Sequence, residues 1–302
     1  MTSVNKQMFL VADTAEAVQA APAQRRLNFA AESERVAKGG SAAHVGQVIA
    51  VARSRGGIGA TMLAVNLAHQ LASIGAKRKG GPARRVALVD LDLQFGMVSG
   101  FLDLEPSPAL YDMARDGSVP DETFLEQSLQ STPDGLDVLC APSAFAPLDA
   151  LRPEQLRGLI EAMQARYDYV VVDLPHALVD WVSPVLGHAG LMYLVTDLSV
   201  PSLQQARRLI DAYSEDNLAM EIEVVVNHEA RPLLPRRQHQ EAARALDREL
   251  RHWLPEDPRA AKEAADRGLP LGRVARRSAL SKAVGKLAQE RLKKAAAAAQ
   301  QN

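Results

Sequence analysis

Short runs of Val, Ile and Leu recur along the middle of this chain, and they constrain its fold more than any other feature. Nearly continuous apolar runs of this length predict strands that are buried on both faces, as in a parallel sheet. The runs are VGQVIAVA (45–52), RRVALVDLD (84–92), GLDVLCAP (135–142), YDYVVVDLP (167–175), GLMYLVTD (190–197) and IEVVVNH (222–228).

Stretches with apolar residues at helical spacing lie between these runs. The predicted helices cover 61–76, 152–167, 200–215 and 234–250. Strands that alternate with helices predict an α/β fold, here a doubly wound, mainly parallel sheet flanked by helices.

A last predicted helix lies near the C-terminus. It places Leu280, Val284 and Leu287 on one face, beside Lys282 and Lys286. A membrane-surface helix would show such a pattern. Packing against the protein core is the favoured interpretation, because the apolar face is short.

The chain divides into three predicted parts. Residues 1–44 are rich in Ala, Ser, Gln and charge, which is typical of a flexible arm. Residues 45–290 form the predicted α/β domain, and residues 291–302 form an Ala-rich, low-complexity tail.

Charge and cysteine usage limit the classes of protein. The net charge is -1, so bulk charge predicts neither nucleic acid nor a membrane as a specific partner. The chain has 1 cysteine, Cys140, which cannot form an internal disulfide and fits a reducing cytoplasm. Its apolar surroundings predict a buried small hydrophobe. No apolar stretch is long enough for a membrane-spanning helix.

The stretch SRGGIGATM (54–62) lies between the first predicted strand and the first predicted helix. A phosphate-binding loop, G-x-x-x-x-G-K-[ST], occupies such a turn in P-loop proteins, where glycines let backbone amides surround phosphate oxygens. Here Ala60 stands at the lysine position, and Thr61 supplies a hydroxyl for Mg²⁺. A Gly-rich turn by itself also occurs as a purely structural feature.

Three aspartates follow other predicted strands and support the functional interpretation. Asp90 and Asp92 end one strand, and Asp173 ends another. Because the carboxyl ends of parallel strands meet at one crevice, these side chains are expected near the Gly-rich loop. Taken singly, an aspartate in such a place is more often a turn or cap residue.

These residues carry a resemblance to a known family. RGGIGATMLAVNLA (55–68), VDLDLQFG (89–96) and VVVDLP (170–175) resemble the MinD/ParA group of P-loop ATPases, whose deviant Walker A loop reads K-G-G-x-G-K-[ST]. Three longer stretches are similar to the CpaE/TadZ branch, the pilus-assembly proteins of Tad (Flp-type) secretion systems. They cover residues 88–116, 171–211 and 255–288.

The chain also departs from the family pattern. The signature lysine that opens the loop is replaced by Arg55, and Met62 stands where a second Ser or Thr contacts phosphate. Alanine at position 60 is itself frequent in the CpaE/TadZ branch. Many members of the branch carry a receiver-like domain before the ATPase, for which residues 1–44 are too few, so MFLVADTAEAV (8–18) is interpreted as a remnant of one.

The resemblance implies a role for each matching residue. It implies ATP or ADP with Mg²⁺ as cofactors. Asp92 would orient the attacking water, while Asp90 and Asp173 would lie near Mg²⁺ through water. Asn227 would recognise adenine, although it could instead be a turn residue that caps a strand, and Pro255 would lie in the loop that covers the base. The implied nucleotide-binding loop comprises Arg55, Gly56, Gly57, Ile58, Gly59, Ala60, Thr61 and Met62.

The resemblance therefore predicts a scaffold for Tad pilus assembly and localisation. It implies a homodimer, with Arg55 reaching across the interface, and contacts with the assembly ATPase and the inner-membrane platform. Such a protein would be cytoplasmic and recruited to the inner membrane or the cell pole through partners. Because the lysine stabilises charge in the transition state, its loss predicts weak or no ATP hydrolysis. The alternative is an active ATPase that positions a cargo through a dimer–monomer cycle.

Overall fold

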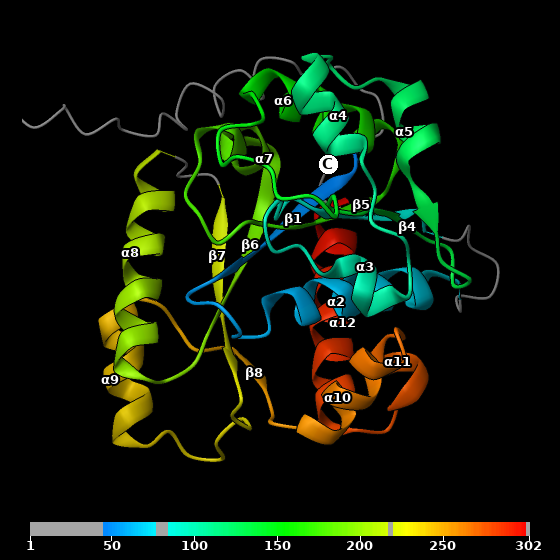
Figure 1. Cartoon of the computed structure of the whole chain (residues 1–302). Coiled ribbons are helices and arrows are strands. Elements are labelled where there is room, and N and C mark those ends of the chain that lie inside the picture. Colours follow the sequence, from blue (N-terminus) through cyan, green and yellow to red (C-terminus); the bar gives the residue numbers. More distant parts are fainter. Residues whose placement is uncertain (1–44, 77–83, 217–219, 300–302) are drawn as a thin grey trace, which may run out of the picture.

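The computed structural model describes residues 45–76, 84–216 and 220–299 (Figure 1). The predicted arm at 1–44, with the proposed receiver-domain remnant at 8–18, lies outside the described residues. At the other end, α12 (Ala279–Ala299) runs without a break past residue 290, where the predicted domain ends.

The described residues form one eight-stranded sheet in the order β3-β4-β2-β5-β1-β6-β7-β8. Neighbouring strands are parallel except for β3 and β4, which are antiparallel. The predicted doubly wound, mainly parallel sheet is thus confirmed. The strands are β1 (Gln47–Arg53), β2 (Val86–Asp90), β3 (Gln130–Ser131), β4 (Leu136–Leu139), β5 (Tyr169–Asp173), β6 (Ala189–Thr196), β7 (Glu221–Asn227) and β8 (His252–Leu254).

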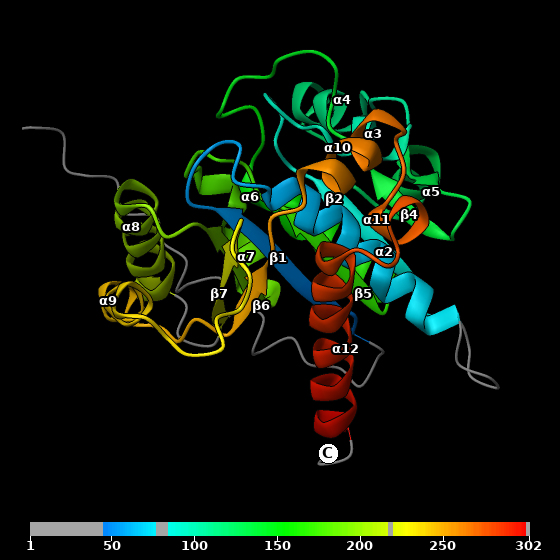
Figure 2. The same cartoon turned by 90° about the horizontal axis from the view of Figure 1, so that it is seen from below.

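Helices cover both faces of the sheet (Figure 1 and Figure 2). One face carries α2 (Ala60–Ala76), α3 (Val98–Leu102), α10 (Pro258–Asp266), α11 (Leu271–Val274) and α12. The other carries α4 (Ala109–Asp116), α5 (Glu122–Ser128), α6 (Pro153–Arg166), η1 (Asp180–Val182), α7 (Ser183–His188), α8 (Val200–Asp216) and α9 (Arg237–Leu246).

Burial along β1 explains its unbroken apolar sequence. Val48, Ala50 and Ala52 pack into the core beneath α6 and α7, while Ile49 and Val51 pack into the core beneath α2. All five side chains are at most 2% exposed. Since successive residues of a strand point to opposite faces, a strand covered on both sides needs apolar residues at every position.

Two further predictions about burial are confirmed. The apolar residues of the last predicted helix, Leu280, Val284 and Leu287, are buried in the core on the α2 side. Cys140 is buried and unpaired. Within the described residues, no helix combines the length and the apolar character needed to cross a bilayer.

The sequence patterns did not predict every element. The helix predicted for 234–250 is shorter in the structure, since α9 ends at Leu246. Asp247 then adopts a left-handed backbone, with φ of 52°, and stops the helix. The chain turns from there into β8, a strand of 3 residues at the sheet edge that the patterns missed. The two-residue β3 was missed as well.

Candidate functional site

The Gly-rich loop connects β1, a central strand, to α2. β1 lies between β5 and β6, which is the central position expected for the strand before a phosphate loop. Gly57 and Gly59 have φ of 72° and 89°, a backbone conformation that favours glycine. A Cβ on Gly59 would also lie 2.5 Å from Nδ2 of Asn227. The loop therefore needs glycine at this position for two independent reasons.

One side of the loop is open and the other is packed. Arg55, Gly56 and Gly57 are exposed, and a Cβ added to either glycine would meet nothing within 4 Å. Ile58 and Ala60, in contrast, are buried. The open side lies just before the N-terminus of α2, a helix of 17 residues. Exposed amides at a helix N-terminus suit the oxygens of a phosphate group.

Thr61 and Asp173 meet beside the loop, as expected from their places at the ends of the elements. The Thr61 hydroxyl donates a hydrogen bond of 2.6 Å to Oδ2 of Asp173, which ends β5. Asp173 is fully buried. Burial raises the pKa of its carboxyl, while Arg53 and Thr61 act in the opposite direction. Met62, the next residue, is buried and offers no polar group to a ligand.

Asp90 holds the loop that follows β2. Its carboxylate accepts hydrogen bonds from the backbone amides of Asp92 (3.1 Å) and Val98 (3.0 Å). It is fully buried, and burial together with the charge of Asp173 raises its pKa from 3.8 to about 8. A carboxyl in this state fixes backbone through its hydrogen bonds and is a poor free ligand for a metal.

Asp92 links that loop to β1. Its Oδ1 accepts a hydrogen bond of 3.0 Å from the backbone amide of Phe95, and its Oδ2 lies 3.3 Å from Nη1 of Arg53. The side chain is only 5% exposed. The three predicted aspartates are therefore brought together at the carboxyl edge of β2 and β5, beside the phosphate loop.

Arg53 is a residue of the site that the sequence patterns missed. It ends β1, and its Nη2 donates to Oδ1 of Asp173 and to the carbonyl of Leu174, both at 2.9 Å. Together with the pair to Asp92, these contacts place the guanidinium between two of the predicted site carboxylates. One signal could have identified it, because Arg53 is the only charged residue in QVIAVAR, a run that is apolar from Val48 to Ala52.

Arg55 points to a different neighbour. Its Nη2 lies 2.5 Å from Oδ2 of Asp197, and its Nε donates to Oγ of Ser202 at 2.9 Å. Burial alone would raise the pKa of Asp197, but hydrogen bonds from Ser199, Arg55 and Ser202 hold it well below its ordinary range. The predicted interface residue is therefore tied, within one chain, to the loop between β6 and α8 and to the first turn of α8.

Asn227 clamps the phosphate loop from β7. Its Nδ2 donates a hydrogen bond of 2.7 Å to the carbonyl of Ile58, and the residue is 4% exposed. The structure thus brings Asn227 to the site, in contact with the loop itself. Its buried amide fixes the loop against the end of β7, which lies two strands from β1 in the sheet.

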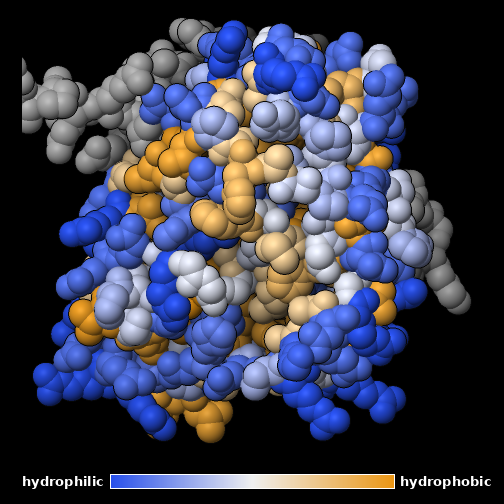
Figure 3. Space-filling model, in the orientation of Figure 1, coloured by the Kyte–Doolittle hydropathy of each residue, from blue (hydrophilic) through white to orange (hydrophobic). Residues whose placement is uncertain are grey.

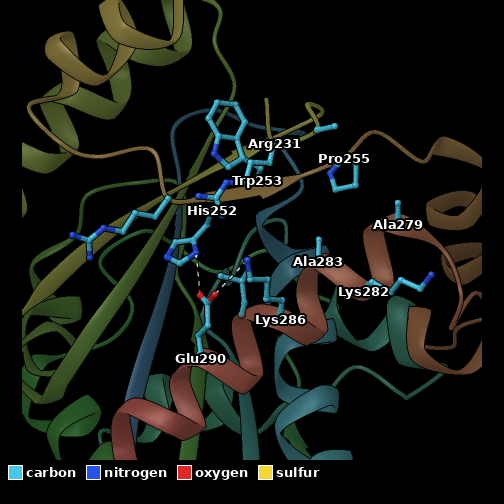
Figure 4. A pocket seen from close by; sticks show the side chains of 12 residues that line it. Arg231, His252, Trp253, Pro255, Ala279, Lys282, Ala283, Lys286 and Glu290 are labelled. Atoms are coloured by element: carbon cyan, nitrogen blue, oxygen red, sulfur yellow. Dashed lines mark ion pairs between the residues drawn. The ribbon is translucent and has the colours of Figure 1, made fainter. Parts of the chain in front are cut away.

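Pro255 lines a cavity of about 350 Å³ between β8 and α12 (Figure 4). Trp253 lies beside it on the strand side, and Lys282 and Lys286 project from α12. Glu290 forms ion pairs there with Lys286 and His252, each at 3.7 Å. Pro255 makes none of the contacts that join the loop, the aspartates and Asn227.

The residues of the site fit the phosphate groups of a magnesium nucleotide better than they fit the Mg²⁺ ion. The open glycines and the helix N-terminus fit phosphate. For Mg²⁺, the hydroxyl of Thr61 and the carboxylate of Asp173 supply oxygen of the kind that this ion prefers, but Arg53 already pairs with the carboxylates. Among the residues that the structure describes, no three His, Cys, Asp or Glu side chains are grouped to hold a metal ion.

Relatives with established names resemble about three fifths of this chain. The antiactivator FleN of Pseudomonas aeruginosa is 32% identical over 187 residues, which is 61% of this chain and 62% of FleN. The septum site-determining protein MinD of Bacillus subtilis is 25% identical over 185 residues, 61% of this chain and 65% of MinD. The matched region thus spans less than two thirds of the length of these curated relatives.

Solved structures match the fold over most of the chain. A ParA family ATPase from Chlorobium tepidum has a TM-score of 0.69 at 24% identity, covering 82% of this chain and 99% of that one. The cell division ATPase MinD of Pyrococcus furiosus has a TM-score of 0.66 at 25% identity, with the same coverage. The model of the AAA domain family matches residues 46–218, more than half of the sequence. The chain therefore belongs to the AAA domain family, as a member of its MinD/ParA-type P-loop ATPases.

Proposed function

We propose that this chain is an ATP-binding scaffold for the assembly and localisation of a Tad (Flp-type) pilus, with weak or no ATP hydrolysis. One observation carries the proposal of nucleotide binding with little hydrolysis. The open glycines, the Thr61–Asp173 hydrogen bond and Asp92 are all in place, yet the helix after the loop begins with Ala60, which is buried and uncharged.

The chemistry of such a site favours binding over turnover. Loop amides and the N-terminus of α2 supply ground-state contacts to phosphate. The lysine of other P-loop proteins stabilises the charge that builds in the transition state, and removing one preorganised group of this kind costs roughly 10²–10³ in rate. A bound nucleotide would therefore serve as a structural element. Mg²⁺ with ADP is bound by MinD of Pyrococcus horikoshii, whose fold this chain shares with a TM-score of 0.64.

The assignment to pilus assembly rests on the sequence stretches at 88–116, 171–211 and 255–288. They resemble the CpaE/TadZ branch. The proposed assembly is a homodimer joined through the face that carries the phosphate loop. Its proposed partners are the assembly ATPase and the inner-membrane platform of the Tad machinery, which would recruit it to the inner membrane or the cell pole.

The proposal is tested in two steps. Calorimetry with ATP and ADP, with and without Mg²⁺, alongside phosphate release, should show nucleotide binding with hydrolysis near background. In the organism of origin, the chain should co-purify with Tad components, and its deletion should abolish or misplace pili. A deletion strain with normal pili would refute the pilus role.

A second candidate is an active ATPase that positions a cellular cargo. It is favoured by the retained Asp92 and by relatives such as MinD of Bacillus subtilis and the chromosome partitioning protein ParA of Caulobacter vibrioides, which is 32% identical over 143 residues. Brisk hydrolysis by the natural chain, lost in Asp92→Ala, would establish this candidate and overturn the first.

A further inference from the structure

Arg53 places a positive charge between two carboxylates of the site. Its guanidinium joins Oδ1 of Asp173 at 2.9 Å and Oδ2 of Asp92 at 3.3 Å, and these carboxylates come from two different strand ends. We propose that Arg53 is a built-in counter-ion that offsets part of the negative charge of this carboxylate pair and thereby competes with a divalent metal for it. The inference concerns the nucleotide site proposed above, but it can be tested without nucleotide.

Burial makes the pairing strong. The Arg53 side chain is 12% exposed, and the side chains of Asp92 and Asp173 are 5% and 0% exposed. Ionic contacts at this depth are screened little by water or salt. Breaking such a buried pair by removing one partner leaves an uncompensated charge, which is strongly destabilising.

Hydrogen bonding shows what fixes the guanidinium. The Nε of Arg53 is buried and has no acceptor among the described residues. An unpaired buried donor is a cost to the fold. The side chain is therefore held through its two Nη atoms, by the two carboxylates and the Leu174 carbonyl, while its Nε makes no hydrogen bond within the part of the chain that the structure describes.

The oxygens of Asp173 are already used. Oδ1 receives the Arg53 guanidinium and Oδ2 receives the Thr61 hydroxyl at 2.6 Å. A magnesium ion prefers carboxylate and water oxygens in an octahedral arrangement. It would have to displace Arg53 from Asp173 and would then lie close to that cation, which Asp92 still holds at 3.3 Å. The proposal therefore predicts low metal affinity in the natural chain and a gain of affinity when the charge at position 53 is removed.

The test measures Mn²⁺ binding to the full chain without nucleotide, by electron paramagnetic resonance of free Mn²⁺. Arg53→Gln keeps a hydrogen-bond donor on a shorter side chain and removes the charge. It should bind Mn²⁺ at least about tenfold more tightly than the natural chain, because a nearby positive charge no longer opposes the ion. Arg53→Lys keeps the charge and should behave like the natural chain.

Thermal unfolding gives an independent readout. Arg53→Gln should have a lower Tm in the presence of EDTA, and added Mg²⁺ should restore much of the loss, while the natural chain should not respond to Mg²⁺. Arg237→Gln is the matched control, because this arginine pairs with Glu241 at 2.7 Å but is 91% exposed. It should change neither the Mn²⁺ affinity nor the response to Mg²⁺.

Two outcomes would overturn the proposal. One is equal Mn²⁺ affinity in Arg53→Gln and the natural chain. The other applies if Arg53→Gln does not fold. Adding Asp92→Asn then removes one carboxylate and should restore a cooperative unfolding transition, so a double variant that is also unfolded contradicts the counter-ion role. A chain that fails to bind ATP would instead refute the proposed scaffold function, since no nucleotide enters these measurements.

Discussion

The two arginines beside the phosphate loop already have carboxylate partners, which leaves the site short of free positive charge. Arg53 pairs with Asp92 and Asp173, and Arg55 pairs with Asp197. A P-loop ordinarily adds a lysine at the start of its helix, but Ala60 adds no charge. A triphosphate bound here would depend on backbone amides and the N-terminus of α2, an arrangement that holds phosphate but speeds its transfer little.

Restoring the lysine tests this account at a single residue. Ala60→Lys should raise ATP affinity, or raise phosphate release by about 10²-fold, because it supplies the charge that the transition state requires. Isothermal calorimetry and a phosphate-release assay measure the two effects. Ala60→Met is the control, since it adds similar length without charge at the same buried position. Equal effects of Lys and Met would show that side-chain volume matters and charge does not.

Asp90 predicts a pH dependence of stability. Burial and the charge of Asp173 raise its pKa from 3.8 to about 8 in the folded state. Between these two values the folded chain keeps a proton that the unfolded chain has lost. By linkage, the free energy of unfolding should therefore fall as the pH rises from about 4 to about 8, and then level off.

Urea unfolding of the natural chain and of Asp90→Asn at pH 5, 6.5 and 8 checks this prediction. The variant cannot titrate at position 90, so its free energy of unfolding should depend less on pH across this range. Other groups titrate in both proteins, which is why the difference between them is the relevant quantity. Parallel pH profiles would show that Asp90 has an ordinary pKa.

At the scale of elements, β7 and the phosphate loop depend on each other through Asn227. Asn227→Ala should lower the free energy of unfolding by about 1–3 kcal/mol, because it leaves the carbonyl of Ile58 without its buried donor. It should also weaken binding of pyrophosphate, since the loop would lose its clamp. Urea unfolding and calorimetry measure these effects, and Glu221→Ala, at the exposed start of β7, is the control.

A different result would point to recognition of the base. If Asn227→Ala binds pyrophosphate as well as the natural chain does but binds ATP more weakly, the amide acts on adenine, as the family resemblance implies. The pyrophosphate measurement separates the two roles because that ligand carries no base.

The sequence patterns predicted those elements whose apolar residues recur at the spacing of a buried strand or helix. Strands such as β1 and β5 are apolar at nearly every position, and the long helices repeat apolar residues every three or four positions. The edge strands β3 and β8, of 2 and 3 residues, are too short for any period and exist only because a neighbouring strand pairs with them. Tertiary pairing of this kind is invisible in a local pattern.

The site could be predicted only in part for a related reason. Aspartates at strand ends were expected to converge, because parallel topology brings such ends together. The partners of those aspartates depend on side-chain direction at the crevice. Arg53 and Asp197 therefore became apparent only when the structure placed them beside Asp173 and Arg55.

At the scale of the whole molecule, the face seen in Figure 3 has apolar residues near its centre within a mainly polar surface. Phe95 and Phe145 are 69% and 75% exposed. Their rings meet edge to face, with the two ring centroids 6.0 Å apart. Phe95 is joined to Asp92 through its backbone amide. Exposed apolar residues held by the site itself suit a surface that is covered on association.

Substitutions of Arg55 give the most direct test of the proposed homodimer interface. In one chain Arg55 is held by Asp197, so reaching a partner subunit requires breaking that ion pair. Arg55→Glu should weaken self-association by about tenfold or more, since it replaces attraction with like-charge repulsion at the interface. Asp197→Asn should strengthen it, because Arg55 is released. Sedimentation equilibrium measures both constants, with Arg237→Glu as an exposed control. A dimer whose association constant is the same in all of these variants does not use this face, and the two phosphate loops would then lie apart.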